Sequence, residues 1–243
     1  MGIEGAYPTA QEIQLIRQEL AKKLSEIDPG EVDQSDVARV NSDDKYVSKF
    51  FRHVFDNPGE QTEAAVKMIL NTLRWRREMG ASHIRESDFP QPVFDKGALF
   101  SRNRDKDGKK LLVFSVFKHI KGQIKMEDMK KFFVYYLERL YREEEGDQIT
   151  LLFDCREAGL KNMDMEFVQF IIGTLKEYYP DPLNYIIVLE MPWVLNGKLK
   201  YFCASYQIFP VFSCVQGDQR LVAAPRSQED QVRDQGQHER VRE

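Results

Sequence analysis

Cys155 is the side chain in this sequence with the most obvious capacity for covalent chemistry. It follows a β-rich run and lies between Asp154 and Arg156, so a thiol nucleophile is conceivable. A cysteine at the end of a strand is far more commonly a small apolar residue of the core. The four histidines have no spacing that builds a metal site, and none lies near a serine or cysteine in a hydrolase motif. The pattern predicts no enzyme, no resident metal and no cofactor.

The acidic segment at residues 103–108 has the second pattern of chemical interest. Asn103, Asp105, Asp107 and Gly108 repeat the spacing at the start of a calcium-binding loop. The twelfth position of such a loop requires a bidentate glutamate, and Phe114 occupies that position here. The segment therefore predicts a hairpin turn rather than a cation site.

The charge balance excludes one large class of partner. A formal net charge of −4 with 30% charged residues gives no overall basicity, so nucleic-acid binding through counterion release has no support. Three scattered cysteines suit a reducing compartment, and the amino terminus lacks a charged region followed by an apolar run. No segment reaches the roughly 18 apolar residues that span a bilayer. We expect a cytoplasmic protein whose contact with membranes is peripheral.

Helical periodicity dominates the chain up to about residue 80. Thr9 and Glu12 form a capping-box pattern ahead of a helix that should end before Gly30. Apolar residues at helical spacing follow in the segment 47–55, and the pattern resumes at 60–79 after an Asn-Pro-Gly break. These segments predict a small helical subdomain.

From about residue 95 the pattern changes to alternating strands and helices. The β-rich runs 110–119, 148–155 and 185–189 are separated by apolar helical stripes at 129–141 and 164–179. This order produces right-handed crossovers between mostly parallel strands. The sequence thus predicts an α/β fold, in which a helical N-terminal subdomain precedes a mixed, mostly parallel sheet walled by helices.

Four motifs follow one another in an order known from one family. They are TLRWRREMG at 72–80, the DKDGK turn with its strand at 105–117, FDCREAGL at 153–160, and YYPDPLNYIIVLEMPWVLN at 178–196. Together they resemble the CRAL-TRIO family, whose domains hold a hydrophobic lipid in an internal cavity. The resemblance covers residues of about 35 to 196 and implies non-catalytic binding or transfer of a lipid.

Alternation along the strands indicates which side chains share a face. One set on the first strand and one set on the second could line a lipid cavity, or helices could simply cover both faces, as in most parallel sheets. The resemblance favours the cavity. The pocket residues that we expect are Leu112, Phe114, Val116, Tyr136, Leu140, Ile149, Leu151, Phe153, Ile171, Leu189 and Trp193.

Two further predictions concern the residues that would contact the lipid head group and those that would face a membrane. Relatives that bind phosphatidylinositol carry hydroxyls where this chain has Ile149 and Leu151, and Glu where it has Asp181. The resemblance therefore leaves two alternatives open, a phosphoinositol head group and a less polar or differently headed ligand, with Asp181 a candidate residue of the cavity mouth. A membrane-facing basic rim is expected from Arg102, Arg104, Lys118, Lys121 and Lys125, each of which would contribute about 1 kcal/mol near an anionic surface.

The sequence after residue 196 departs from the family pattern. A gate helix and a last strand should follow, but neither is recognisable in residues 197–243, and the segment from 216 is polar with few core-forming residues. Codons for Gly197 and Lys198 can form a splice donor, so we interpret residues 197–243 as a retained intron followed by out-of-frame translation. We expect this tail to be disordered, which would leave the pocket without its lid and an edge of the sheet exposed.

The predicted organisation is an N-terminal helix (1–33), a CRAL-TRIO helical subdomain (35–80), an incomplete lipid-binding domain (95–196) and the aberrant tail (197–243). The partners expected are a hydrophobic lipid and a membrane surface, with no nucleic acid. One alternative function is an interaction module with a vestigial pocket that recruits proteins. Another is a small hydrolase, which would require covalent labelling at Cys155 or a serine. The resemblance implies an endoplasmic-reticulum role only for a longer parent protein that carries a membrane anchor.

Overall fold

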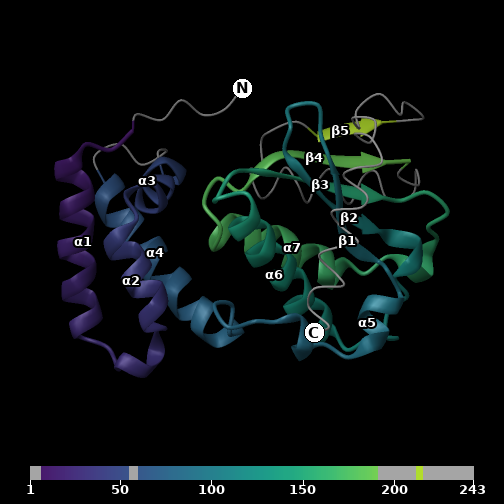
Figure 1. Ribbon diagram of the computed structural model, residues 1–243, viewed down its shortest axis with the longest axis horizontal. Coiled ribbons are helices and arrows are strands. Elements are labelled where there is room, and N and C mark those ends of the chain that lie inside the picture. Colours follow the sequence, from purple (N-terminus) through teal and green to yellow (C-terminus); the bar gives the residue numbers. More distant parts are fainter. Residues whose placement is uncertain (1–6, 55–59, 191–211, 216–243) are drawn as a thin grey trace, which may run out of the picture.

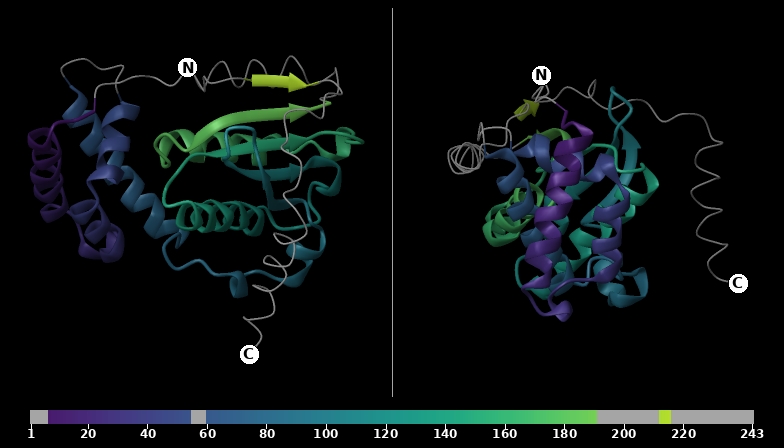
Figure 2. Two further views of the ribbon diagram at one scale, coloured as in Figure 1. Left: turned by 45° about the horizontal axis from the view of Figure 1, so that its top comes forward. Right: turned by 90° about the vertical axis from the view of Figure 1, so that its left-hand side faces the viewer.

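The computed structural model describes residues 7–54, 60–190 and 212–215. Two bodies make up this part of the chain: a group of four helices at one end of the molecule, and a sheet with further helices at the other (Figures 1 and 2). The chain passes from the first body to the second after Met79, where Gly80 adopts a left-handed φ of 67° and ends the last helix of the first body. This division matches the change of pattern in the sequence near residue 80.

The first body consists of α1 (Ala10–Ser25), α2 (Gln34–Ser42), α3 (Asp44–His53) and α4 (Gln61–Met79). The predicted capping box at the start of α1 is confirmed. The Glu12 amide donates to Thr9 Oγ1 at 3.2 Å, and the Thr9 amide donates to Glu12 Oε2 at 2.7 Å. The apolar stripes of α1, α3 and α4 meet in one shared core, with Ile16, Phe50 and Ile69 fully buried at its centre.

The second body is built on a five-stranded sheet with the order β1-β2-β3-β4-β5. Its strands are β1 (Leu99–Arg104), β2 (Lys110–Ser115), β3 (Ile149–Asp154), β4 (Leu183–Leu189) and β5 (Phe212–Val215). The β1–β2 pair is antiparallel, and β2, β3, β4 and β5 run parallel to one another. The predicted mixed, mostly parallel sheet is therefore confirmed.

Helices α6 (Met126–Glu143) and α7 (Met165–Glu177) are the crossovers of this sheet, and both lie against one of its faces (Figure 1). The short α5 (Gln91–Asp95) and the 3₁₀ turns η1 (Pro29–Glu31), η2 (Glu86–Asp88), η3 (Val116–Lys118) and η4 (Leu160–Asn162) complete the described elements. The large core of the molecule lies between the sheet and these two helices, with Phe114, Phe133 and Phe167 packed edge-to-face in it.

The turn between β1 and β2 is the predicted hairpin. Asp105 is buried there and accepts hydrogen bonds from the amides of Asp107 and Lys109, at 2.9 and 2.8 Å. The Thr150 hydroxyl of β3 donates to the second carboxylate oxygen of Asp105 at 2.6 Å. The carboxylate thus fixes the turn and ties it to the sheet, which gives Asp105 a structural role.

Two expectations need correction. Val116 does not continue the strand, because β2 ends at Ser115 and the chain turns into η3. The expectation that no strand follows residue 196 is wrong for residues 212–215, because β5 pairs in parallel with β4 and covers its outer edge from Ile186 to Leu189. The rest of the predicted tail lies outside the described residues, so its disorder and its reading as a retained intron stay predictions.

Candidate functional site

The two faces of the sheet differ in what packs against them. We call the face that contacts α6 and α7 the helix-packed face, and the opposite one the second face. The second face carries its own apolar cluster, which among the described residues consists of strand residues only. Its members are Leu111, Val113, Leu152 and Ile187, with Phe100, Tyr185 and Leu189 partly buried beside them.

The register of the strands brings these side chains into one continuous apolar band. Val113 is paired with Phe100 of β1 on one side and with Leu152 of β3 on the other, and Leu152 is paired with Ile187 of β4. Since paired residues project to the same side of a sheet, the band crosses four neighbouring strands. An apolar floor of this kind is what a binding site for a hydrocarbon chain requires.

Polar groups border the band at both ends of the strands. At the amino ends of β3 and β4, Asp105 accepts hydrogen bonds from Thr150 and Asn184, at 2.6 and 2.9 Å. At the carboxyl end of β3, the Arg156 guanidinium donates twice to the carboxylate of Asp154, at 2.8 and 2.6 Å, and this lowers the pKa of Asp154. The face is thus apolar in its middle and polar at both ends.

The residues predicted to line the pocket lie mostly on the other face. Leu112 pairs with Leu151 and Phe114 pairs with Phe153, so the two predicted strand sets share one face, and that face is filled by α6 and α7. This helix-packed core holds Leu112, Phe114, Val116, Leu140, Ile149, Leu151, Phe153 and Ile171, with Tyr136 packed against it. Leu189 belongs to the second face, and Trp193 lies outside the described residues. Cys155 is buried in the helix-packed core, which confirms the prediction that it is a core residue.

Asp181 lies at a turn before β4, in a left-handed conformation with a φ of 51°. Its carboxylate accepts a hydrogen bond from Gln148 Nε2 at 2.7 Å and lies 3.7 Å from the Arg52 guanidinium of α3. These contacts link the helical body to the amino ends of β3 and β4. The role of Asp181 at a cavity mouth stays a prediction.

The five residues of the predicted basic rim do not gather in one place. The guanidinium of Arg104 is held by both carboxylate oxygens of Glu144, at 2.6 and 2.8 Å, beyond the carboxyl end of α6. Lys118, Lys121 and Lys125 are exposed and follow the carboxyl end of β2, whereas Arg102 is exposed on the edge strand β1. Of the five residues, only Lys118, Lys121 and Lys125 share one segment, which follows β2.

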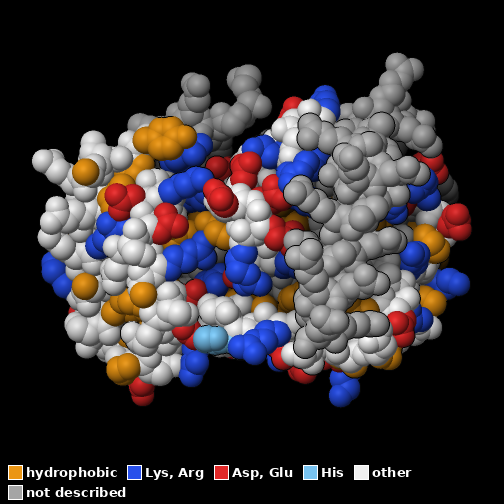
Figure 3. All heavy atoms as spheres, viewed as in Figure 1, with side chains coloured by type: hydrophobic (Ala, Val, Ile, Leu, Met, Phe, Trp, Pro, Cys, Tyr) orange, Lys and Arg blue, Asp and Glu red, His pale blue; other side chains and the backbone are white. Residues whose placement is uncertain are grey.

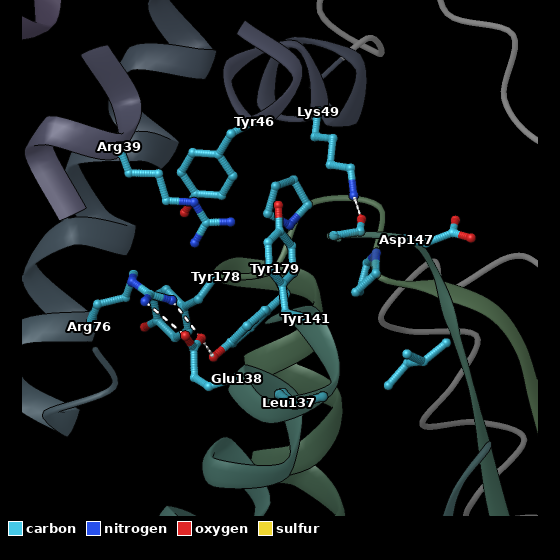
Figure 4. A pocket seen from close by; sticks show the side chains of 14 residues that line it. Arg39, Tyr46, Lys49, Arg76, Leu137, Glu138, Tyr141, Asp147, Tyr178 and Tyr179 are labelled. Atoms are coloured by element: carbon cyan, nitrogen blue, oxygen red, sulfur yellow. Dashed lines mark hydrogen bonds and ion pairs between the residues drawn. The ribbon is translucent and has the colours of Figure 1, made fainter. Parts of the chain in front are cut away.

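A separate cavity of about 30 Å³ lies between the helical body and the sheet body (Figure 4). This volume is roughly the share of one water molecule in the liquid, so the cavity is far too small for a lipid. Tyr46, Lys49, Tyr141 and Pro182 are among the residues that line it. Burial raises the pKa of Tyr46 to about 12 and lowers the pKa of Lys49, and the Lys49 ammonium donates to the carbonyl of Gly146.

Beside this cavity, buried charged residues join the two bodies, and we call Asp36, Arg76, Glu138 and Tyr179 the joint. Arg76 of α4 donates to both carboxylate oxygens of Glu138 of α6, at 2.7 and 3.0 Å (Figure 4). The Arg76 Nε lies 2.9 Å from an Asp36 oxygen. The Tyr179 hydroxyl donates to Glu138 at 2.6 Å. All four side chains are buried, so the ion pairs are little screened by solvent.

Two of the recognised sequence motifs meet at the joint. Arg76 and the preceding Trp75 belong to the WRRE segment, and Tyr178 and Tyr179 belong to the YYP segment. The ring of Trp75 stacks on that of Tyr178, with centroids 4.4 Å apart and planes inclined by 8°. The sequence showed both motifs but did not predict that they meet. Arg76 of the first motif and Tyr179 of the second are joined through Glu138 of α6, which belongs to no recognisable motif.

The part of the chain that the structure describes contains neither a metal-binding cluster nor a membrane-spanning helix. No group of three or more His, Cys, Asp or Glu side chains there could hold a metal ion. Within the same residues, no helix is long and apolar enough to cross a membrane.

Comparisons with known proteins agree with this architecture. The family model of the CRAL/TRIO domain matches residues 94–204, which runs past residue 196, where the sequence resemblance ended. CRAL-TRIO domain-containing protein C3H8.02 of Schizosaccharomyces pombe is 27% identical over 146 residues, which cover 56% of this chain and 33% of that protein. Phosphatidylinositol transfer protein CSR1 of Eremothecium gossypii is 24% identical over 208 residues, which cover 79% of this chain and 46% of that protein.

The fold has a counterpart among solved structures. The crystal structure of Sfh5 aligns with a TM-score of 0.50 and 17% identity, covering 82% of this chain and 77% of that one. The two chains thus share an α/β fold with N-terminal helices ahead of a mostly parallel sheet walled by helices. Residues 94–204 thus match the CRAL/TRIO family model, and the fold around them agrees with that match. It spans about a third to a half of the length of the curated relatives named above.

Proposed function

We propose that this chain binds one hydrophobic lipid without changing it chemically, and that the lipid lies on the second face of the sheet. The observation that carries the proposal is the apolar band across β1 to β4, which faces away from α6 and α7. The CRAL/TRIO match supports a lipid as the class of ligand, and so does the name of the Eremothecium relative as a phosphatidylinositol transfer protein.

The physical chemistry of the band suits a hydrocarbon chain. Each methylene group that leaves water contributes about 0.8 kcal/mol, so an acyl chain on this band would gain several kcal/mol without any charged contact. The polar groups at the two ends of the strands offer two positions for the head group of the lipid. Asp154 and Arg156 lie at the carboxyl end, and Asp105 with Asn184 lies at the amino end.

The helix-packed face cannot serve the same purpose without loss of the fold. The side chains of both faces are buried, but the cluster on the second face contains strand residues only among those described, whereas Leu112 and Phe114 of the helix-packed face pack against residues of α6 and α7, such as Phe167. A lipid there would have to displace α6 or α7 from a close-packed core. We therefore propose that the lipid lies on the opposite face from most of the residues that alternation and the family resemblance together suggested.

Native mass spectrometry of the gently purified chain tests the proposal. We expect a stoichiometric co-purifying lipid, and we expect Leu152→Trp to reduce its occupancy because the indole would fill the band. Leu151→Met is the matched control, since Leu151 is adjacent in β3 but projects to the helix-packed face. Thermal unfolding of both variants shows whether they fold.

Two results would overturn the proposal. One is a wild-type chain that never retains a lipid after incubation with lipid extracts. The other is equal lipid occupancy in folded Leu152→Trp and in Leu151→Met. The second result would favour the alternative of an interaction module whose pocket is vestigial.

A further inference from the structure

Two neighbouring turns at the carboxyl ends of β2 and β3 expose large apolar side chains. Phe117 lies in η3 and is 39% exposed, and Leu160 lies in η4 and is 75% exposed. Large apolar side chains with this exposure are rare in the described part of the chain, where only Tyr7 and Leu15 are comparable. Both of those lie in the helical body or just ahead of it, so the two turns form the one such pair on the sheet body as described.

Lysines lie in the same two segments as this apolar pair, and the nearest exposed carboxylate along the chain is Glu157, one residue before the second segment. Residues 116–125 and 158–163 contain Lys118, Lys121, Lys125 and Lys161, and neither segment contains an aspartate or a glutamate. All four lysines are exposed. Figure 3 shows basic, acidic and hydrophobic side chains together at the right-hand end of the molecule, toward which β3 and β4 point in Figure 1.

Buried polar contacts hold the two turns together. Asn162 is 1% exposed, and its side-chain amide donates to the carbonyls of Phe117 and His119, at 2.9 and 2.8 Å. The Lys121 amide donates to the Lys161 carbonyl at 3.3 Å, and the buried His119 ring lies 3.2 Å from an Asp164 oxygen. The apolar side chains are therefore presented from a fixed scaffold.

We propose that Phe117, Leu160 and the lysines 118, 121, 125 and 161, which we call the η3–η4 surface, dock this protein on an anionic lipid membrane. Apolar side chains would enter the boundary between head groups and acyl chains, and each lysine would meet the negative surface potential. The inference rests on the proposed function for the class of partner and deepens it by naming the surface that meets the bilayer. When the protein docks through this surface, the carboxyl ends of β2 and β3 face the membrane that would supply the lipid.

Vesicle co-sedimentation tests the apolar part of the surface. We expect the wild-type chain to bind phosphatidylcholine vesicles that contain phosphatidylserine, and to bind pure phosphatidylcholine vesicles much more weakly. Replacement of both Phe117 and Leu160 by alanine should lower the partition coefficient about tenfold. The variant has less apolar surface to transfer from water into the bilayer, so it gains less free energy on binding. Leu15→Ala is the control, since Leu15 is 44% exposed on α1, in the helical body.

Charge reversal tests the basic part of the surface. Each lysine near an anionic bilayer contributes about 1 kcal/mol, so every substitution by glutamate should lower the partition coefficient at least about fivefold. The effect should shrink as ionic strength rises. The test variant changes Lys118, Lys121 and Lys161 to Glu, and the charge-matched control changes the exposed Lys23, Lys45 and Lys67 of the helical body to Glu.

The same preparations are examined by native mass spectrometry, so that the two proposals can fail separately. Loss of vesicle binding in the test variants, with lipid occupancy and the controls unchanged, is the expected result. A wild-type chain that carries lipid but ignores anionic vesicles overturns the docking surface alone, and so do control variants that lose as much binding as the test variants. A chain that sediments with vesicles but never holds a lipid overturns the proposed function and leaves the docking surface intact.

Discussion

The joint and the second face of the sheet are built from opposite kinds of side chain. At the joint, four buried polar residues from three helices and a loop satisfy one another through short hydrogen bonds and ion pairs. Across the middle of the second face, apolar side chains from four strands lie in register without a charge. A buried ion pair fixes geometry but tolerates no loss of a partner, whereas an apolar band accepts exchange of its contacts. The joint therefore fixes how the helical body sits on the sheet, whereas the second face carries the apolar band on which we propose that a lipid binds.

Loss of Arg76 should have the largest effect on stability. Arg76→Ala leaves Glu138 and Asp36 buried without their cation, which typically costs about 3–5 kcal/mol. Urea unfolding measures the change. Arg77→Ala is the matched control, because the adjacent side chain is 53% exposed and should change the free energy of unfolding by less than about 0.5 kcal/mol. Equal losses in the two variants would show that the joint does not fix the two bodies.

Removal of one hydroxyl at the joint should cost less. Tyr179→Phe deletes the hydrogen bond to Glu138, and a bond to a charged group is worth about 1.5–3 kcal/mol. Tyr178→Phe is the control, since it keeps the ring that stacks on Trp75 and removes a hydroxyl outside the joint. The difference between the two variants in thermal unfolding measures the bond. A control that is as unstable as Tyr179→Phe would place the effect in ring packing.

Because of the joint, the free energy of unfolding should also depend on pH in the acid range. Burial raises the pKa of Glu138, but the Arg76 guanidinium and the hydrogen bonds from Arg76 and Tyr179 outweigh it, so the net pKa lies below the usual 4.5. A lowered carboxyl pKa contributes stability that is present above the unfolded value and is lost as pH falls through the folded value. The free energy of unfolding should therefore decrease as pH falls below about 4.5.

Chemical denaturation at a series of pH values checks this sign. The decrease should be smaller in Glu138→Gln, which has no carboxyl to protonate. Asp154→Asn offers the contrast at the end of the second face, where Arg156 lowers the pKa of Asp154 but is itself 52% exposed. Asp154 should contribute less than Glu138 to the pH dependence of the free energy of unfolding, because solvent screens the Asp154–Arg156 ion pair. A larger change for Asp154→Asn than for Glu138→Gln contradicts the comparison.

The sequence predicted most helices and strands within a few residues, because their apolar periodicity is strong. The alternation in 148–155 anticipated β3, and the stripe from Met129 to Tyr141 anticipated α6. Helix α2 was not predicted, since it has nine residues and few apolar side chains to show a period. The end of β2 was misjudged because Val116 is as β-prone as the residues before it, and only the turn into η3 removes it from the sheet.

The candidate site was harder to predict than the fold. Alternation shows that Leu112 and Phe114 share a face, but it does not say which face the helices cover. That choice depends on the handedness of the crossovers through α6 and α7 and on the register that pairs Leu112 with Leu151. The joint was hidden for a similar reason, because Arg76 and Glu138 are 62 residues apart and no local pattern links a cation to its distant partner.

The smallest expected effect distinguishes the two faces themselves. Val113→Thr replaces a methyl group with a hydroxyl on the second face, and Val188→Thr makes the same change on the helix-packed face. Val188 is fully buried against close-packed side chains, so its hydroxyl should cost about 1–3 kcal/mol. Val113 is also buried, at 8% exposed, but no helix packs on its cluster among the described residues, so we expect a smaller loss than at Val188.

Lipid occupancy should show the reverse order. A hydroxyl from Val113→Thr lies in the band that an acyl chain would contact, so native mass spectra should show less bound lipid than in wild type. Val188→Thr should keep its lipid for as long as it is folded, because Val188 projects toward α6 and α7. If Val188→Thr loses more lipid than Val113→Thr at a temperature where both are folded, the lipid lies on the helix-packed face. The faces would then have exchanged roles, since stability and binding would depend on the same side chains.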